Sequence, residues 1–201
     1  MRLKPVAVLA KAPIPGFAKT RLIPAVGAHA AAVLQERLTE HAVETAVAAG
    51  TGPVTLWCAP DTSHDSFRAL AARLPITLAQ QPAGDLGIRM LTALGAGGLV
   101  IGSDCAAFTP AHLRAAADAL KRAEVVLIPA EDGGYVLIGM RGPHPALFTD
   151  MTWGTSAVLA ETRKRIAALR LEAVELDPLW DVDSEDDLAR LEREHSDLAL
   201  L

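Results

Sequence analysis

The chain of 201 residues has few aromatic side chains and only two cysteines. Aromatic residues make up 4% of the sequence, which is too few for a surface on which nucleic-acid bases stack. The net charge of -5 argues against non-specific nucleic-acid binding, because such binding depends on neutralising phosphates. Cys58 and Cys105 indicate neither a disulfide framework nor a zinc site, since the sequence has no CxxC pair and no histidine cluster.

The sequence also lacks a long apolar run. No stretch approaches the roughly 20 apolar residues that a membrane helix needs, and Lys11 interrupts the first short run. We therefore expect a cytoplasmic protein with no membrane partner. Hydrophobic residues at 51% and charged residues at 21% are typical of a compact fold. Because no repeat, low-complexity tract or linker is present, we expect one domain over residues 1–201.

Short apolar runs alternate with helical patterns along the chain. The runs predict strands over residues 3–10, 54–58, 76–79, 99–102, 125–129, 135–140 and 171–176. The patterns predict helices over residues 28–49, 66–74, 88–96, 110–122 and 155–169, and from Ser184 onward. This alternation predicts an α/β fold with a largely parallel sheet. The turn at Asp132-Gly133-Gly134 is too short for a parallel crossover, so we expect its two strands to be antiparallel.

The first predicted strand ends in a loop that contains Lys11, Lys19, Arg21, two prolines and Gly16. A strand that ends in such a loop before a helix commonly holds phosphates. Two residues separate Gly16 from Lys19, however, so the adjacent Gly-Lys-Ser/Thr of a Walker A motif is missing. Taken alone, the loop is equally compatible with a solvated turn.

Carboxylates follow the later predicted strands: Asp104 the fourth, Asp132 the fifth, and Asp181 and Asp183 the last. Ligands of open α/β sheets bind beyond the carboxyl ends of the strands. Cations and carboxylates at that edge favour a site for phosphates with Mg²⁺. Each residue also has a purely structural interpretation. Asp104 suits a cap or a turn, Asp132 suits a hairpin turn, and Asp181 and Asp183 suit the cap of the last helix.

Six segments together resemble a known family. They are Lys11-Ala12-Pro13-x-Pro15-Gly16-x-x-Lys19-Thr20-Arg21-Leu22, Gly84-Asp85-Leu86-Gly87-x-Arg89-Met90, Gly102-Ser103-Asp104-Cys105, Asp132-Gly133-Gly134-Tyr135, Trp153-x-Thr155 and Asp181-Val182-Asp183. With them, nearly the whole chain resembles the bacterial glycosyltransferase-A-like family (transferase 1, radical-SAM/selenodomain-associated) of the nucleotide-diphospho-sugar transferase superfamily. The segment from Lys19 to Leu22 is also similar to 2-phospholactate guanylyltransferases and, more distantly, to molybdenum-cofactor guanylyltransferases.

This resemblance implies a three-layer α/β/α Rossmann-like sandwich with a mostly parallel mixed sheet. It implies metal ligation of Mg²⁺ or Mn²⁺ by Asp104 and Asp183, and a turn at Asp132 that faces the acceptor. It further implies that Lys19 and Arg21 contact the nucleotide phosphates and stabilise charge during the reaction. The remaining nucleotide-binding residues that it implies are Lys11, Pro15 and Gly16 near the phosphates and Gln81, Gly84 and Asp85 near the base.

We therefore expect a Mg²⁺-dependent transferase that uses a nucleoside triphosphate or a nucleotide sugar together with a small-molecule acceptor. The loop from Lys19 to Leu22 favours nucleotidyl transfer, whereas the family name favours glycosyl transfer. A hydroxyl acceptor needs a general base, for which Asp132 is the candidate, while a phosphate or carboxylate acceptor needs none. Two further hypotheses are a non-catalytic nucleotide-binding protein on the same scaffold and a P-loop-like kinase, against which the missing Walker A adjacency argues.

Overall fold

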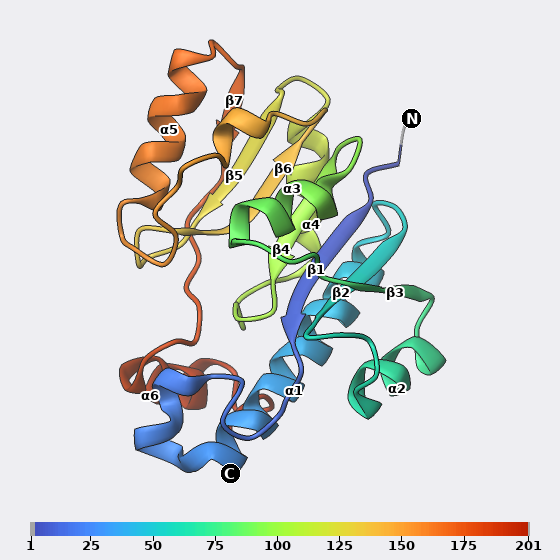
Figure 1. The fold of residues 1–201 in the computed structure, drawn as a ribbon, viewed down its shortest axis with the longest axis vertical. Coiled ribbons are helices and arrows are strands. Elements are labelled where there is room, and N and C mark those ends of the chain that lie inside the picture. Colours follow the sequence, from blue (N-terminus) through green and yellow to red (C-terminus); the bar gives the residue numbers. More distant parts are fainter. Residues whose placement is uncertain (1–2, 201) are drawn as a thin grey trace.

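The computed structural model describes residues 3–200, so the ends of the expected domain, residues 1, 2 and 201, lie outside the described residues. Within this range the core of the protein is a seven-stranded sheet of order β3-β2-β1-β4-β6-β5-β7 (Figure 1). Its strands are β1 (Val6–Lys11), β2 (Val54–Ala59), β3 (Ile76–Gln80), β4 (Gly98–Gly102), β5 (Val125–Pro129), β6 (Tyr135–Met140) and β7 (Ala173–Glu175).

One strand runs against the others. β6 pairs antiparallel with both β4 and β5, while β1, β2, β3 and β4 pair in parallel with one another and β7 pairs in parallel with β5. The expected antiparallel pair around Asp132–Gly134 is therefore confirmed. Because β6 lies between β4 and β5, the tight turn that joins β5 to β6 lies near the carboxyl end of β4.

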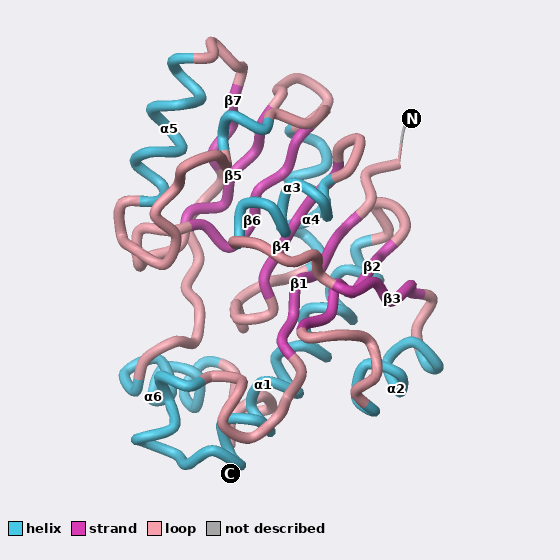
Figure 2. Tube along the Cα trace, viewed as in Figure 1, coloured by secondary structure: helices cyan, strands magenta, loops and turns pink. Residues whose placement is uncertain are grey.

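Helices cover both faces of the sheet (Figures 1 and 2). They are α1 (Ile23–Ala49), α2 (Asp65–Arg73), α3 (Leu86–Leu94), α4 (Pro110–Ala119), α5 (Val158–Ala168) and α6 (Glu185–Glu194). Apolar residues of α1, α2 and α4 pack on one face, and those of α3 and α5 pack on the other. The expected three-layer α/β/α sandwich with a mixed sheet is thus confirmed. The central strands are buried on both faces, as their continuous apolar sequences predict.

Helix α1 begins at Ile23, five residues before the predicted start at Ala28. Gly27 lies within it with a φ of 80°, which breaks the helical geometry but does not end the element. Leu22, which ends the short 3-10 helix Thr20–Leu22 directly before α1, is buried against the core. Glycine adopts this φ without the cost that a side chain imposes. Gly27 therefore suggests the start of a helix in the sequence, whereas in the structure it marks a kink within α1.

The C-terminal segment leaves the sheet at the carboxyl edge of the parallel strands and packs on α1. A long connection after β7 leads to α6, which lies beside the start of α1 (Figures 1 and 2). Trp180, Val182 and Leu191 form one buried cluster with Leu22 and Leu34. This cluster brings the residues that follow β7 against the loop that follows β1, and so closes one side of the site described below.

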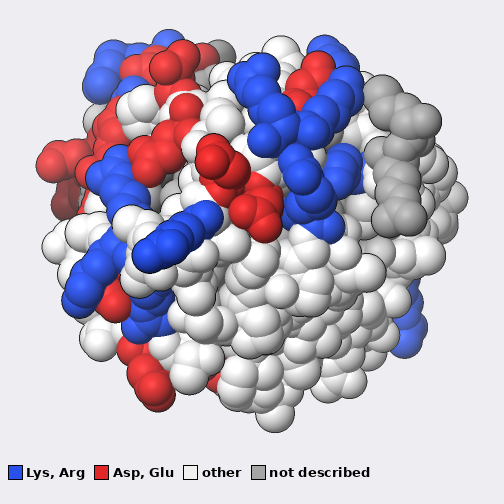
Figure 3. Space-filling view, turned by 90° about the horizontal axis from the view of Figure 1, so that it is seen from above, with Lys and Arg blue, Asp and Glu red and all other residues white. Residues whose placement is uncertain are grey.

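Charges of both signs share the surface at the amino ends of the parallel strands. Figure 3 shows a group of Lys and Arg side chains there with Asp and Glu side chains beside it, and a broad uncharged area next to them. Among the residues that the structure describes, no helix has the length and apolarity that crossing a bilayer requires.

Candidate functional site

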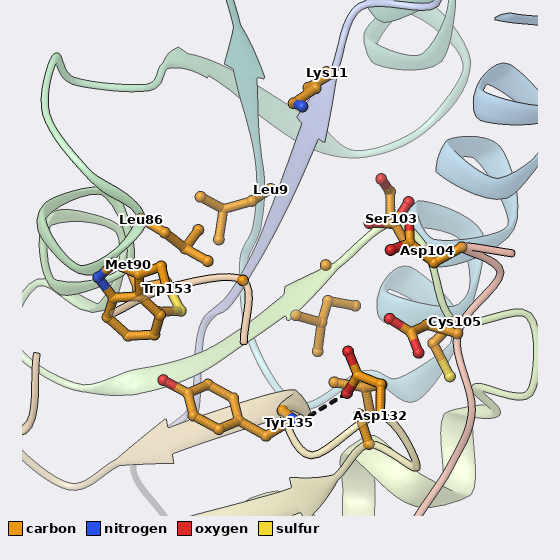
Figure 4. Close-up of a pocket in the computed structure, with 18 of the residues that line it drawn as sticks. Leu9, Lys11, Leu86, Met90, Ser103, Asp104, Cys105, Asp132, Tyr135 and Trp153 are labelled. Carbon is orange, nitrogen blue, oxygen red and sulfur yellow. Dashed lines mark hydrogen bonds between the residues drawn. The ribbon is translucent and has the colours of Figure 1, made fainter. Parts of the chain in front are cut away.

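A cavity of about 570 Å³ lies at the carboxyl ends of β1 and β4, between the sheet and the C-terminal segment. It brings together residues from opposite ends of the chain (Figure 4). Seven of the predicted site residues line it: Lys11, Lys19, Arg21, Gln81, Asp104, Asp132 and Asp183. Four others, Pro15, Gly16, Gly84 and Asp85, lie in the adjoining loops and are not part of its lining.

Lys19 joins the three chain segments at the charged end of the cavity. Its ammonium group forms an ion pair with Asp104 and donates a hydrogen bond of 2.6 Å to the carbonyl oxygen of Val182. The Val182 amide in turn donates to the carbonyl oxygen of Asp104 at 2.9 Å. The side chain of Lys19 is only 3% exposed and its backbone is left-handed, with a φ of 47°. Non-glycine residues rarely adopt that conformation, and it is often found at functional sites.

Arg21 pairs with the second predicted metal ligand, Asp183. Both side chains of this pair are well exposed, at 68% and 41%. Water screens such a pair, so it contributes little to stability and exchanges readily for another partner. The loop after β1 thus offers one buried cation, which holds Asp104 in place, and one exposed cation, which is able to turn toward a ligand.

A buried polar network supports the end of β4. Gln35 on α1 donates hydrogen bonds from its amide nitrogen to Ser103 at 2.9 Å and to Thr39 at 3.0 Å. All three side chains are buried. Since Ser103 precedes Asp104, this network fixes the backbone on which the carboxylate stands. Gln35 is not among the residues predicted for the site; the signal for it in the sequence is a glutamine on the helix face that otherwise carries Leu34 and Leu38.

Asp181 faces the cavity beside three other carboxylates. Burial raises its pKa to about 6, and the negative charges of Asp132, Asp104 and Asp183 add to the increase, while Lys19 opposes it. The shift therefore comes first from burial of the carboxyl group, and the neighbouring carboxylates add to it.

Neither Asp181 nor Asp183 caps the last helix through its side chain. The cap of α6 is Ser184, whose hydroxyl accepts from the Asp187 amide, and Asp187 reciprocates by accepting from the Ser184 amide at 2.7 Å. The predicted start of the last helix at Ser184 is therefore confirmed. The structural alternative that made Asp181 and Asp183 cap residues is wrong, because this pair of bonds already satisfies the helix terminus.

The donor set fits a magnesium ion that arrives with phosphates. Asp104 and Asp183 offer hard carboxylate oxygens, and their side chains are 45% and 41% exposed. Mg²⁺ is usually held by one or two carboxylates together with substrate phosphates and water. Within residues 3–200, no group of three or more His, Cys, Asp or Glu residues is arranged to hold a metal ion by itself. A metal shared between carboxylates and a phosphate ligand needs no such group.

The polar atoms expected near a base are already engaged within the protein. The Gln81 amide nitrogen donates to the carbonyl oxygens of Ala10 at 3.1 Å and Trp57 at 2.9 Å, and so ties the ends of β1 and β2 together. Asp85 is the N-cap of α3 and accepts from the Ile88 amide at 2.9 Å. These bonds give Gln81 and Asp85 clear structural roles, whatever ligand the cavity takes.

Asp132 lies in the turn between β5 and β6. One carboxylate oxygen accepts a hydrogen bond of 2.8 Å from the Gly134 amide, as Figure 4 shows beside Tyr135. An aspartate has two carboxylate oxygens with several acceptor positions, so this bond orients the group and still leaves acceptor capacity. The turn is both a hairpin turn and part of the cavity lining, so the structural and functional interpretations of Asp132 coexist.

The wall of the cavity next to α3 carries an apolar patch. Leu9, Leu86, Met90 and Trp153 line it, with Tyr135 at its edge (Figure 4). The Trp153 indole stacks on Phe148 with ring centroids 6.3 Å apart. A side chain at Gly87 would bring its Cβ to 2.9 Å from the indole, so glycine is needed there for the close approach of the ring to α3. Trp153 is therefore a fixed wall of the cavity.

We expect both thiols to be unreactive in the folded protein. Burial raises the pKa of Cys58 and of Cys105 to about 12. At about pH 8 only about one thiol in 10⁴ is then the nucleophilic thiolate. An aromatic disulfide reagent should titrate no thiol under native conditions and both thiols in concentrated guanidinium. Rapid labelling of either cysteine in the native protein would contradict this.

Solved structures with the same architecture include three with named activities. A candidate nucleotide-diphospho-sugar transferase from Desulfovibrio desulfuricans G20 is 27% identical, with a TM-score of 0.84 over 98% of this chain and 90% of that one. A nucleotidyl transferase from Methanothermobacter thermautotrophicus is 14% identical, with a TM-score of 0.61 over 94% and 96% of the chains.

The third structure is the 4-diphosphocytidyl-2C-methyl-D-erythritol synthase from Anaerococcus prevotii DSM 20548. It is 9% identical, with a TM-score of 0.55 over 92% of this chain and 94% of that one. At such low identity the second and third structures establish the fold alone. No curated protein matches the chain. A family model does match, over residues 42–155, and the chain thus belongs to the family described as "Uncharacterized protein conserved in bacteria (DUF2064)".

Proposed function

We propose that the protein is a Mg²⁺-dependent nucleotidyltransferase that acts on a nucleoside triphosphate and a small-molecule acceptor. The observation that supports this best is the meeting of two cation–carboxylate pairs, Lys19 with Asp104 and Arg21 with Asp183, at the carboxyl edge of the sheet. Such an edge is where ligands of α/β sheets bind. Placement within the glycosyltransferase-A-like family, and one functional domain over residues 1–201, are part of this proposal.

In this proposal Asp104 and Asp183 hold the metal, which when bound supplies positive charge to the triphosphate. Lys19 keeps Asp104 in position, and an ammonium has a third N–H for a phosphate oxygen. Arg21 exchanges Asp183 for a phosphate and stabilises charge as it develops. An acceptor oxygen attacks the α-phosphorus, the bond to the bridging oxygen breaks, and pyrophosphate leaves with the electron pair. Where the acceptor is a hydroxyl, Asp132 takes its proton.

Nucleotidyl transfer is favoured by the segment from Lys19 to Leu22, which is similar to guanylyltransferases. Glycosyl transfer from a nucleotide sugar is the second candidate. It is supported by the 27% identity to the Desulfovibrio protein, a candidate nucleotide-diphospho-sugar transferase, over 98% of this chain. Both reactions use the same metal and phosphate site, so the donor that binds decides between them.

Isothermal titration with Mg²⁺ tests the proposal. We expect at least one nucleoside triphosphate to bind in the micromolar range, more tightly than UDP-glucose and GDP-mannose, and to release pyrophosphate when a panel of phosphorylated, carboxylated and hydroxylated acceptors is added. Selective binding of a nucleotide sugar would replace nucleotidyl with glycosyl transfer. Binding of neither class would refute both. Asp118→Asn, an exposed change on α4 that breaks only a local ion pair with Lys121, is the matched control.

A further inference from the structure

Two more cations line the cavity, away from the pairs that Lys19 and Arg21 make. They are Lys11, the last residue of β1, and Arg89 on α3. Within residues 3–200, neither forms an ion pair with a carboxylate, whereas Lys19 and Arg21 each have one. The positive charge left for an anionic ligand is therefore concentrated at Lys11 and Arg89.

Lys11 and Arg89 lie on the same rim of the cavity. Side chains alternate along a strand, so Lys11 projects to the same face of β1 as Leu9, which is the face that α3 covers (Figure 4). Arg89 donates to the carbonyl oxygen of Gly84 at 3.2 Å and, at 3.5 Å, to Gln81. Gln81 in turn donates to the carbonyl oxygen of Ala10, the neighbour of Lys11. This chain of bonds fixes the guanidinium near the end of β1, with N–H groups to spare.

An apolar shelf lies beside this rim. Its surface comes from Leu9, Leu86, Tyr135 and Trp153, and Leu86 is 43% exposed despite its size. The indole N–H of Trp153 is buried and has no hydrogen-bond partner among the described residues. Immobile aromatic and aliphatic walls of this kind suit a flat, apolar ligand body.

The charges in the rest of the cavity determine which way such a ligand lies. Asp132 and Asp181 also line the cavity, and their carboxylates repel an anionic group from its centre. An anionic group is therefore stabilised at the rim and the apolar body at the shelf. A metal-bound triphosphate has its own partners at Asp104 and Asp183, so Lys11 is free for a second anion and departs from the role near the nucleotide phosphates that the resemblance implies for it.

We propose that this half of the cavity is the acceptor subsite and that the acceptor is an organic anion with a flat apolar body. Lys11 and Arg89 hold its phosphate or carboxylate group, and Leu9, Leu86, Tyr135 and Trp153 hold its body. The assignment as an acceptor subsite rests on the proposed transferase function. The binding chemistry itself, an anion next to an apolar surface, does not depend on it.

The test uses phenyl phosphate as a probe, compared with inorganic phosphate, benzoate and benzyl alcohol. Binding is followed by the indole N–H signals of the three tryptophans in ¹⁵N-labelled protein, with Trp153→Phe identifying the signal of Trp153. We expect phenyl phosphate and benzoate to shift the Trp153 signal, and phenyl phosphate to bind at least about tenfold more tightly than inorganic phosphate or benzyl alcohol.

Variants at the rim supply the decisive comparison. Lys11→Gln and Arg89→Gln should each weaken phenyl phosphate binding about tenfold, while the exposed Arg122→Gln, outside the cavity lining, should leave it unchanged. Unchanged binding in both rim variants, or a Trp153 signal that phenyl phosphate does not move, would overturn the proposal.

Adding a Mg²⁺-bound nucleoside triphosphate separates this proposal from the proposed function. Binding of both ligands at once supports an acceptor subsite. Displacement of phenyl phosphate by the nucleotide would show that the shelf holds the nucleotide itself, and would overturn the assignment to the acceptor. If no nucleotide binds but phenyl phosphate still depends on Lys11 and Arg89, the anion subsite stands and the nucleotidyltransferase proposal fails.

Discussion

Asp104→Asn is expected to lower kcat/KM for pyrophosphate release by about 10³-fold or more, because it removes a charged ligand of the metal and its phosphates. The amide keeps the shape of the side chain but not its negative charge. The same variant should lose measurable Mg²⁺-dependent nucleotide binding in isothermal titration. The exposed Asp118→Asn should retain both properties. Activity within tenfold of the parent protein would contradict the assignment of Asp104 as the metal-binding carboxylate.

Asp104→Asn is also expected to lower the stability of the fold, because Asp104 is the counter-charge of a buried ammonium. Lys19 is 3% exposed, whereas Asp104 is 45% exposed. Loss of Asp104 leaves an unpaired buried cation, which should cost about 2–3 kcal/mol of unfolding free energy. Lys19→Met leaves a carboxylate that water still reaches, along with the unpaired Val182 carbonyl, and should cost about 1–2 kcal/mol.

The double variant Lys19→Met/Asp104→Asn separates the two effects. Without a charge on either side, it should be more stable in urea unfolding than Asp104→Asn alone, and it should remain inactive. If instead the double variant is less stable than both single variants, the pair is not coupled as the contacts indicate. If the double variant regains activity together with stability, Asp104 contributes to activity only by stabilising the fold.

The meeting of cations and carboxylates could be predicted from the sequence because it follows from topology. Parallel strands end at one edge, so a loop after β1 and an aspartate after β4 must lie near each other. The partner of each group could not be predicted in this way. Lys19 reaches Val182 because Trp180 and Leu191 pack on Leu22, a contact between residues more than 150 positions apart. Local patterns contain no signal for packing at that range.

The bonds that Gln81 and Asp85 form within the protein could not be predicted from the sequence either, and their placement near the base stays a prediction. Polar residues in a loop after a strand look the same in the sequence whether they contact a ligand or the protein's own backbone. In the structure Asp85 caps α3 and Gln81 ties β1 to β2. Conversely, the sequence indicates Arg89 and Trp153 only as parts of motifs, since nothing in their spacing shows that α3 and the segment after β6 face the same cavity.

Gly133→Ala is expected to destabilise the fold by about 3–5 kcal/mol, because it combines backbone strain with a backbone clash. Gly133 has a φ of 91°, which side chains rarely allow. An added Cβ would lie 2.8 Å from the Cα atom of Ser156, closer than real Cβ contacts come. The Gly133 carbonyl also accepts from the Leu159 amide at 2.9 Å, so the turn cannot move away without losing its contact with α5. Urea unfolding measures the loss.

Gly142→Ala is the matched control, since nothing lies within 4 Å of the Cβ that it adds; it should change stability by no more than about 0.5 kcal/mol. The clash also has a functional consequence. Asp132 accepts from the Gly134 amide within the same turn, so any adjustment of the turn moves the Asp132 carboxylate. Under conditions in which Gly133→Ala remains folded, it should bind phenyl phosphate through Lys11 and Arg89 nearly as the parent does, while transfer to a hydroxyl acceptor falls. Equal stability of the two glycine variants would show that the turn yields without cost, and Asp132 would then lack the fixed position that a general base needs.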